Sequence, residues 1–155
     1  MIVIKTDLEI NAPIEVCFDL ARDIQLHTVT VWRHTKERAV EGTCVGRINR
    51  GETVTFEATH FLIRQRLTSR ITEFERPYIF VDQMVSGAFK SMKHTHEFKE
   101  RNGATLMTDT LQFEAPFGFL GWIVERLLLR YYMKRFIEYR NNELKKIAEG
   151  RQARV

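Results

Sequence analysis

The chain has few cysteines and no long apolar run. Only two cysteines, Cys17 and Cys44, occur among the 155 residues, and their spacing matches no metal-binding or redox motif. We therefore expect two reduced thiols rather than a disulfide framework. No apolar stretch reaches the roughly 18 residues that a membrane-spanning helix needs. The N-terminal segment lacks the charged start, the apolar run and the cleavage site of a signal peptide, so we expect a cytoplasmic protein.

Positive and negative residues are also nearly balanced in number. The formal net charge is only +4, and the isoelectric point lies near 9.2. The excess lies in residues 117–155, which carry nine Lys and Arg against four Glu. A mild excess of this kind suits an anionic ligand or a membrane surface. The sequence has neither a basic strip with interleaved aromatic residues nor a motif that reads nucleic acid, so we expect no nucleic acid partner.

Length and composition predict a single domain. A chain of 155 residues with 44% hydrophobic residues can build one core, and no internal repeat or low-complexity segment divides it. We expect the domain to span residues 1–149 and a flexible basic tail to follow over residues 150–155.

The segment Phe89–Pro116 has the pattern of a long β-hairpin. Alternating runs flank Asn102-Gly103, a pair typical of type I′ turns because both central positions of such a turn need a positive φ. Pairing around a two-residue turn places His96 opposite Asp109. Side chains alternate across a strand, so eight residues share one face of the hairpin. They are Met92, His94, His96, Phe98, Met107, Asp109, Leu111 and Phe113. Five of these eight are apolar, so we expect this face to be buried.

Two histidines and one aspartate therefore lie on an otherwise apolar wall. Burying such groups costs on the order of a few kcal/mol unless they are paired, so they need partners or a function. Four interpretations are open: a satisfied network in which His96 bonds to Asp109, a ligand-facing polar site, catalytic acid/base residues, or a metal site. His94, His96 and Asp109 could supply three zinc ligands. No further ligand cluster stands out, so we predict no metal and no cofactor.

Alternation and turn signals predict the remaining elements up to the hairpin. Strands are expected over residues 2–10, 35–41, 52–61, 63–75 and 78–85, with short helices after Asn11-Ala12-Pro13 and within Asp23–Trp32. We place Asn11 or Ala12 at the cap of the first helix and Pro13 in its first turn. The inward residues of the strand 52–61 are Val54, Phe56, Ala58 and His60. The register of Tyr78–Val85 is not fixed, so whether Asp82 or Gln83 joins the buried wall is open.

Residues 117–149 are predicted to form one long C-terminal helix. Its second half has an apolar stripe of Leu129, Met133, Phe136, Leu144 and Ile147. We expect Arg140, in the middle of this stripe, to snorkel, to pair with a sheet carboxylate or to reach an anionic ligand group. The first half is apolar nearly all round, with Leu120, Ile123, Val124, Leu127 and Tyr131 on the side that is charged further along. Loops of the same domain or a helix break near Gly118–Gly121 would cover them, or they form a homodimer or membrane-surface contact.

The order of these elements predicts an α+β helix-grip fold. One strand, two short helices, six strands and one long helix follow one another, and strands joined by short turns form an antiparallel meander. A strongly bent sheet of about seven strands must bury its concave face, and the C-terminal helix is the large element left to cover it. One helix rarely fills the whole concavity, so we expect a hydrophobic cavity beneath it.

Three segments carry a resemblance to a known family. They are Ile10–Pro13 with Val16–Leu20, Gly87–Phe98 and Asp109–Gly118. Over roughly residues 2–148 the chain resembles the START/SRPBCC superfamily, and within it the bacterial single-domain members similar to polyketide cyclase/dehydrase and lipid-transport proteins. This resemblance implies a hydrophobic ligand held between the sheet and the final helix.

Two functions agree with these expectations. The first is binding or carriage of a small hydrophobic ligand such as a lipid, isoprenoid, quinone or polyketide. The predicted ligand-binding residues are Phe56, His60, Met92, His94, His96, Phe98, Met107, Asp109, Leu111, Phe113, Met133, Phe136 and Arg140. The second is a cyclase or dehydratase that acts on a polyketide-like substrate. In that enzyme His96 would be the general acid or base and Asp109 would orient it. His94 or Arg140 would stabilise an enolate oxygen.

Overall fold

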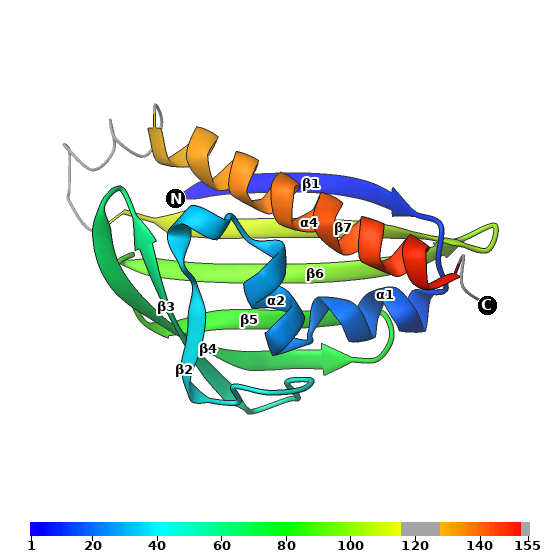
Figure 1. Ribbon diagram of the computed structural model, residues 1–155, viewed down its shortest axis with the longest axis horizontal. Helices are drawn as coiled ribbons and strands as arrows, with labels where there is room; N and C mark the ends of the chain where they lie inside the picture. The colour runs from blue at the N-terminus through cyan, green and yellow to red at the C-terminus, as the bar shows by residue number, and fades with distance from the viewer. Residues whose placement is uncertain (116–127, 153–155) are drawn as a thin grey trace.

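One seven-stranded antiparallel sheet dominates the computed structural model, which describes residues 1–115 and 128–152. The strand order is β1-β7-β6-β5-β4-β3-β2 (Figure 1). The strands are β1 (Ile2–Ile10), β2 (Arg38–Gly42), β3 (Thr53–His60), β4 (Ile63–Glu75), β5 (Ile79–Ser86), β6 (Ser91–Arg101) and β7 (Ala104–Glu114). The helical elements described are α1 (Ile14–Ala21), α2 (Ile24–Thr30), the 3₁₀ turn η1 (Arg33–Thr35) and α4 (Arg130–Gln152). The predicted helix-grip fold is confirmed.

The helix α4 covers one side of the concave face. In Figure 1 it lies along β1 and β7, while α1 and α2 lie beside it in front of β6 and β5. At the far side of the sheet the β3–β4 hairpin bends toward the start of α4. The rings of Phe61 in this hairpin and Tyr132 in α4 are 4.4 Å apart. The sheet therefore curls around a space that α4 closes on one side.

The β6–β7 hairpin has the predicted register. His96 pairs with Asp109, and the turn residues Asn102 and Gly103 have φ of 51° and 82°, as a type I′ turn requires. Seven of the eight side chains predicted to face inward are buried, and His94 is half-buried. The turn chemistry of two residues thus sets the position of every side chain on this wall.

The structure also fixes the register of β5, which the sequence leaves open. Across the β5–β6 ladder Phe80 pairs with His96, and Asp82 pairs with His94. Directly opposed residues of an antiparallel pair share a face, so Asp82 points to the concave side. Gln83 therefore points to the convex side. The polar wall gains a second carboxylate in this way.

Two apolar clusters form the core. In the first, Phe18 of α1 is fully buried and its ring packs edge-on at 5.4 Å against Phe74, Phe80 and Phe98. The second consists of Ile2, Ile4, Met92, Leu111, Phe113 and Ile137. On the inner face of β6, Met92 belongs to one cluster and Phe98 to the other. The polar residues between them are therefore flanked by an apolar cluster on each side.

Some element boundaries differ from the predictions. Pro13 is the N-cap of α1 and not part of its first turn. The strand expected from residue 35 begins at Arg38, because η1 and the left-handed conformation of Lys36 (φ 48°) occupy its start. The helix α4 continues to Gln152, so the first residues of the predicted tail, 150–152, are helical.

The predicted apolar start of the C-terminal helix falls mostly outside the described residues. This is the case for Leu120, Ile123, Val124 and Leu127. Tyr131, the remaining member of the set, lies in the first turn of α4 and is 68% exposed. A homodimer or membrane-surface contact through this segment stays a prediction. No helix within the described ranges is long and apolar enough to cross a membrane.

Candidate functional site

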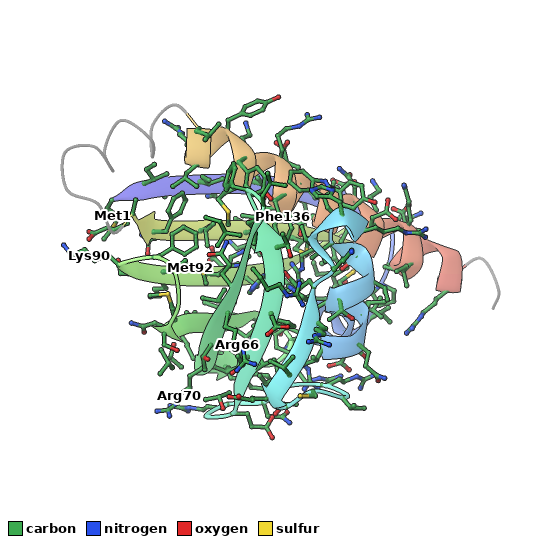
Figure 2. The ribbon with its side chains drawn as sticks, turned by 60° about the vertical axis from the view of Figure 1, so that its left-hand side comes forward. Met1, Arg66, Arg70, Lys90, Met92 and Phe136 are labelled. Carbon is green, nitrogen blue, oxygen red and sulfur yellow. The ribbon has the colours of Figure 1, made fainter. Side chains whose placement is uncertain are left out.

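A cavity of about 790 Å³ lies between the concave face of the sheet and α4. Its volume falls within the roughly 300–1,000 Å³ of pockets that bind small molecules. Figure 2 shows Met92 on the sheet side and Phe136 on α4, and both line this space. Nine of the predicted ligand-binding residues line it: Phe56, His60, Met92, His94, His96, Leu111, Met133, Phe136 and Arg140.

Four predicted ligand-binding residues do not line the cavity. Phe98 and Met107 pack with Phe18 in the first apolar cluster, and Phe113 packs in the second. Asp109 lies behind the two histidines and its side chain is fully buried. The expectation that Phe98, Met107 and Phe113 line the cavity was wrong, and Asp109, expected to orient the polar end of a ligand, does not reach the cavity wall. Strand alternation assigns a face but not the depth at which other elements cover it. The helix α1 covers one end of the inner face of the β6–β7 hairpin.

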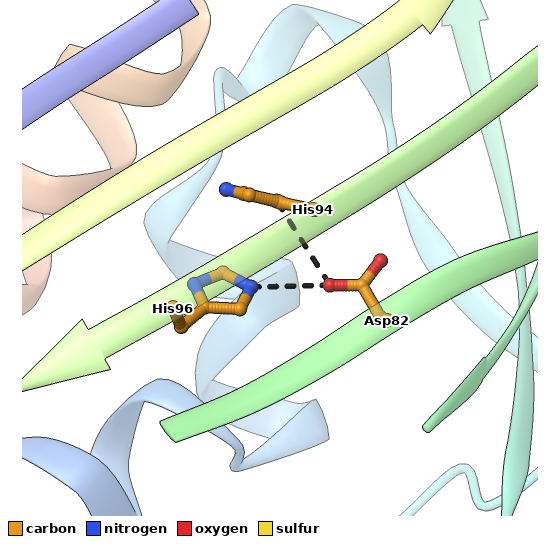
Figure 3. A group of neighbouring side chains, drawn as sticks. All are labelled: Asp82, His94 and His96. Carbon is orange, nitrogen blue, oxygen red and sulfur yellow. Dashed lines mark hydrogen bonds and ion pairs between the residues drawn. The ribbon is translucent and has the colours of Figure 1, made fainter. Parts of the chain in front are cut away.

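Three polar side chains meet at the cavity wall (Figure 3). Asp82 comes from β5, and His94 and His96 come from β6. Nε2 of His96 forms a hydrogen bond of 3.1 Å with Oδ2 of Asp82. Nδ1 of His94 lies 3.9 Å from the same oxygen. One carboxylate oxygen at the wall is thus shared by two imidazoles.

Asp109 lies on the other side of both imidazoles. Its Oδ1 is 2.5 Å from Nδ1 of His96 and 3.4 Å from Nε2 of His94. Neither contact has the direction of a hydrogen bond, so the attraction is chiefly electrostatic. Its Oδ2 accepts a hydrogen bond of 2.5 Å from Nδ2 of Asn141 on α4. The predicted cross-strand position of His96 opposite Asp109 is confirmed, but the two side chains are in ionic contact and are not hydrogen-bonded to each other.

Burial and these contacts together set the charges of the cluster. Burial alone would raise the pKa of the Asp109 carboxyl, but the charge of His96 and the contacts with both histidines hold it well below its usual range. Burial would also raise the pKa of Asp82, but the hydrogen bond from His96, together with the positive charges of His94, His96 and Arg140, lowers it below its ordinary value. For His96, burial lowers the pKa, but the two carboxylates outweigh it and raise the pKa above its ordinary value. Burial and the charge of His96 lower the pKa of His94. These shifts favour two carboxylates, a protonated His96 and a neutral His94.

Arg140 reaches the cavity wall from α4, and its hydrogen bonds go to the two short helices. Its Nη2 donates to the carbonyl oxygen of Ala21 at 3.0 Å, and its Nε donates to Nδ1 of His27 at 3.2 Å. Of the three roles left open for Arg140, the ion pair with a sheet carboxylate is not formed among the described residues, and contact with an anionic ligand group stays a prediction. The guanidinium instead ties α4 to α1 and α2. Its positive charge still contributes to lowering the pKa of Asp82.

Three further polar residues at this site have no counterpart in the sequence predictions. The Tyr132 hydroxyl and Nδ1 of His60 form a hydrogen bond of 2.8 Å, and burial lowers the pKa of His60. His27 contacts Arg140, and Asn141 contacts the buried carboxylate behind the histidines. Asn141 directly follows Arg140 in α4, and it is buried although the helical periodicity places it on the charged side. No sequence signal therefore pointed to its contact with the sheet.

Comparison with known protein families shows to which family the chain belongs. Residues 1–149 match the family model described as polyketide cyclase / dehydrase and lipid transport. The chain belongs to this family. No curated protein matches the sequence of this family member.

Solved structures agree with the family assignment at the level of the fold. TTHA0849 from Thermus thermophilus has a TM-score of 0.75 at 17% identity, and the match covers 96% of this chain and 98% of that one. A START superfamily protein from Mycobacterium smegmatis has a TM-score of 0.70 at 12% identity, with 96% and 97% covered. The ginseng major latex-like protein 151 from Panax ginseng has a TM-score of 0.64 at 11% identity, with 94% and 96% covered. The predicted START-like resemblance of this polyketide cyclase/dehydrase and lipid transport family member is confirmed.

Proposed function

We propose that this protein binds a small hydrophobic ligand, such as a lipid, isoprenoid, quinone or polyketide, in the cavity between the sheet and α4. The observation that carries the proposal is a cavity of about 790 Å³ with a mainly apolar wall and a compact polar cluster on one side. Burial of apolar surface is favourable by roughly 25 cal/mol per Å². A few polar groups then fix the orientation of the ligand.

Two methionines support a ligand of variable shape. Met92 lies on β6 and Met133 on α4, and both line the cavity. Methionine is unbranched and polarisable, so it repacks around different apolar shapes. We therefore expect selectivity to depend on the length and the polar end of the ligand more than on a rigid outline.

The cluster of Asp82, His94 and His96 would hold the polar end of the ligand. The side chains of Asp82 and His94 are 20% and 14% exposed, so both reach the cavity surface. A ligand hydroxyl can donate to Oδ2 of Asp82 and accept from a histidine N–H, whereas a carbonyl can only accept. Each such bond contributes about 1 kcal/mol. A molecule with one hydroxyl or carbonyl at the end of an apolar body fits this arrangement.

Native mass spectrometry of the purified protein, followed by organic extraction, tests this function. A stoichiometric lipid, quinone, isoprenoid or polyketide supports the proposal. Ala58→Phe should abolish the bound mass, because Ala58 is buried on β3 and lines the cavity. Thr59→Phe is the matched control, since the next side chain on the strand points to the opposite face. Protein that carries no such molecule and takes up neither added decanol nor an added quinone contradicts the proposal.

A cyclase or dehydratase is the second candidate, and the position of His96 between two carboxylates favours it. In a dehydration the Asp82 carboxylate would take a proton next to a substrate carbonyl. Protonated His96 would give its Nε2 proton to the leaving hydroxyl, so that one water departs and one carbon–carbon double bond forms. A β-hydroxy thioester offered to the protein should then lose water, and His96→Gln should keep uptake but abolish this loss. Unchanged substrate with both proteins would rule out this candidate.

A further inference from the structure

The cluster of Asp82, His94 and His96 has the composition of a metal site. Within the part of the chain that the structure describes, it is the one group of three or more His, Cys, Asp and Glu side chains whose ligand atoms all lie within 4.8 Å of one another. We propose that this cluster binds one divalent cation of the zinc type, Zn²⁺ in the first instance, at the wall of the cavity. The sequence alone predicts no metal, because no further ligand cluster stands out beside His94, His96 and Asp109 and the register of Asp82 stays open.

The distances from the Asp82 oxygen to the two imidazole nitrogens fit one ion, and all three ligand atoms lie within 4.8 Å of one another. Oδ2 of Asp82 is 3.1 Å from Nε2 of His96 and 3.9 Å from Nδ1 of His94. Zinc binds imidazole nitrogen and carboxylate oxygen at roughly 2.0–2.2 Å, so ligand atoms around one zinc ion lie about 3–4 Å apart. In Figure 3 both contacts converge on the same oxygen. An ion between the three atoms therefore needs only small side-chain adjustments.

The position of Asp109 is a second, separate observation. The nitrogens that do not face Asp82, Nδ1 of His96 and Nε2 of His94, lie 2.5 Å and 3.4 Å from Oδ1 of Asp109. Histidines that bind metals almost always present their other nitrogen to a carboxylate, a carbonyl or water, which fixes the ring orientation and the tautomer. Asn141 in turn donates to the remaining oxygen of Asp109. One buried carboxylate thus lies against the far nitrogens of both imidazoles, in ionic contact with them.

The ligand types and the charges select the ion. Two imidazoles and one carboxylate match three-ligand zinc sites, which keep a further position open for water or substrate. Calcium and magnesium prefer oxygen ligands. The carboxylates of Asp82 and Asp109 balance the two charges of the ion when both imidazoles are neutral. The proton between His96 and Asp82 leaves to solvent as the ion binds.

The open coordination position would face the cavity, because all three ligands line it. A bound ion there would polarise a carbonyl oxygen or bind a hydroxyl oxygen of the molecule in the cavity. This consequence rests on the proposed ligand binding, whereas metal binding itself does not. A test with metal alone therefore separates the two proposals.

Zinc titration of the chelator-treated protein by calorimetry tests the site. We expect saturable binding of one Zn²⁺ per chain, with affinity at least tenfold lower in Asp82→Asn and in His94→Gln, because each change removes a ligand. Both side chains reach the cavity surface, so these variants should fold, and circular dichroism checks this. His34→Gln is the matched control, since His34 is exposed on η1 and should leave zinc affinity unchanged.

Cobalt substitution provides a second readout. The visible absorption of bound Co²⁺ reports ligand identity and geometry, so the bands should disappear in His94→Gln. They should shift in Asn141→Ala, which removes no ligand but loosens Asp109, and zinc affinity should fall about tenfold. Zinc affinity that is equal in the wild type, Asp82→Asn and His94→Gln would place the ion elsewhere and overturn the proposal. Absence of saturable zinc binding by the wild type would overturn it as well.

Discussion

Asp109→Asn removes the charge from the centre of the buried cluster while it keeps the shape of the side chain. The carboxylate is fully buried and 2.5 Å from Nδ1 of His96, whose protonated form it stabilises. Removing one partner of a buried ion pair costs about 3–5 kcal/mol. Asp82 still pairs with His96, so we expect the low end, about 3 kcal/mol. For a chain of this size that corresponds to a decrease of roughly 6–12 °C in melting temperature.

Asp82→Asn is the informative comparison, because the same chemical change is made at the cavity surface. The Asp82 side chain is 20% exposed, so solvent screens its charge, and an asparagine oxygen can still accept from His96. We expect a loss of about 1 kcal/mol. Urea unfolding of both variants measures the difference. Asp7→Asn, on the exposed face of β1, is the control and should change stability by less than about 0.5 kcal/mol.

Equal losses in Asp109→Asn and Asp82→Asn would refute this reasoning, since it depends on the difference in burial between the two carboxylates. A larger loss in Asp82→Asn would refute it more strongly. A double-mutant cycle with Asn141→Ala adds a check. Because Asn141 donates to Asp109, we expect a coupling energy of about 0.5–3 kcal/mol between these positions.

Two further predictions concern the rest of the fold. Burial alone would raise the pKa of Asp19, but hydrogen bonds from Arg76 and Arg22 lower it below its ordinary value. The stability that this carboxylate adds is therefore present above about pH 4 and is lost as the pH falls below that value. Asp19→Asn should consequently flatten the decline of the urea midpoint between about pH 5 and about pH 3. An unchanged decline would contradict this. Leu62→Gly should raise stability by about 1 kcal/mol, because Leu62 is 98% exposed at φ 66°. Gly103→Ala, at φ 82° in the other hairpin, should lower stability by a similar amount, and thermal melts measure both.

The sequence predicts the β6–β7 wall well because one local signal determines it. Asn102-Gly103 fixes the turn type, and strand alternation then carries the register from the turn to Met92 and Phe113 without further information. The pairing of His96 with Asp109 follows from the same two residues. The face of each side chain is therefore predictable, whereas the extent of the cavity depends on how α1 and α4 pack over that face.

The parts of the site that the sequence leaves open depend on longer-range geometry. Asp82 joins the wall through the β5–β6 register, and the connection over residues 87–90 has no turn signal that fixes it. Arg140 bonds to Ala21 and His27, more than a hundred positions away in the chain. Such contacts arise from the packing of helices against each other. Periodicity identifies the buried side of a helix but not the partner that it meets.

Methyl NMR of labelled methionine tests the central claim, that a hydrophobic molecule occupies the cavity. The chain has five methionines. Met92 and Met133 line the cavity, Met107 is buried in the core outside it, and Met1 is 74% exposed. Titration with decanol should shift the Met92 and Met133 signals in a saturable way and leave Met1 and Met107 unchanged. Signals of Met92 and Met133 that do not move, or a shift confined to Met1, would contradict the account.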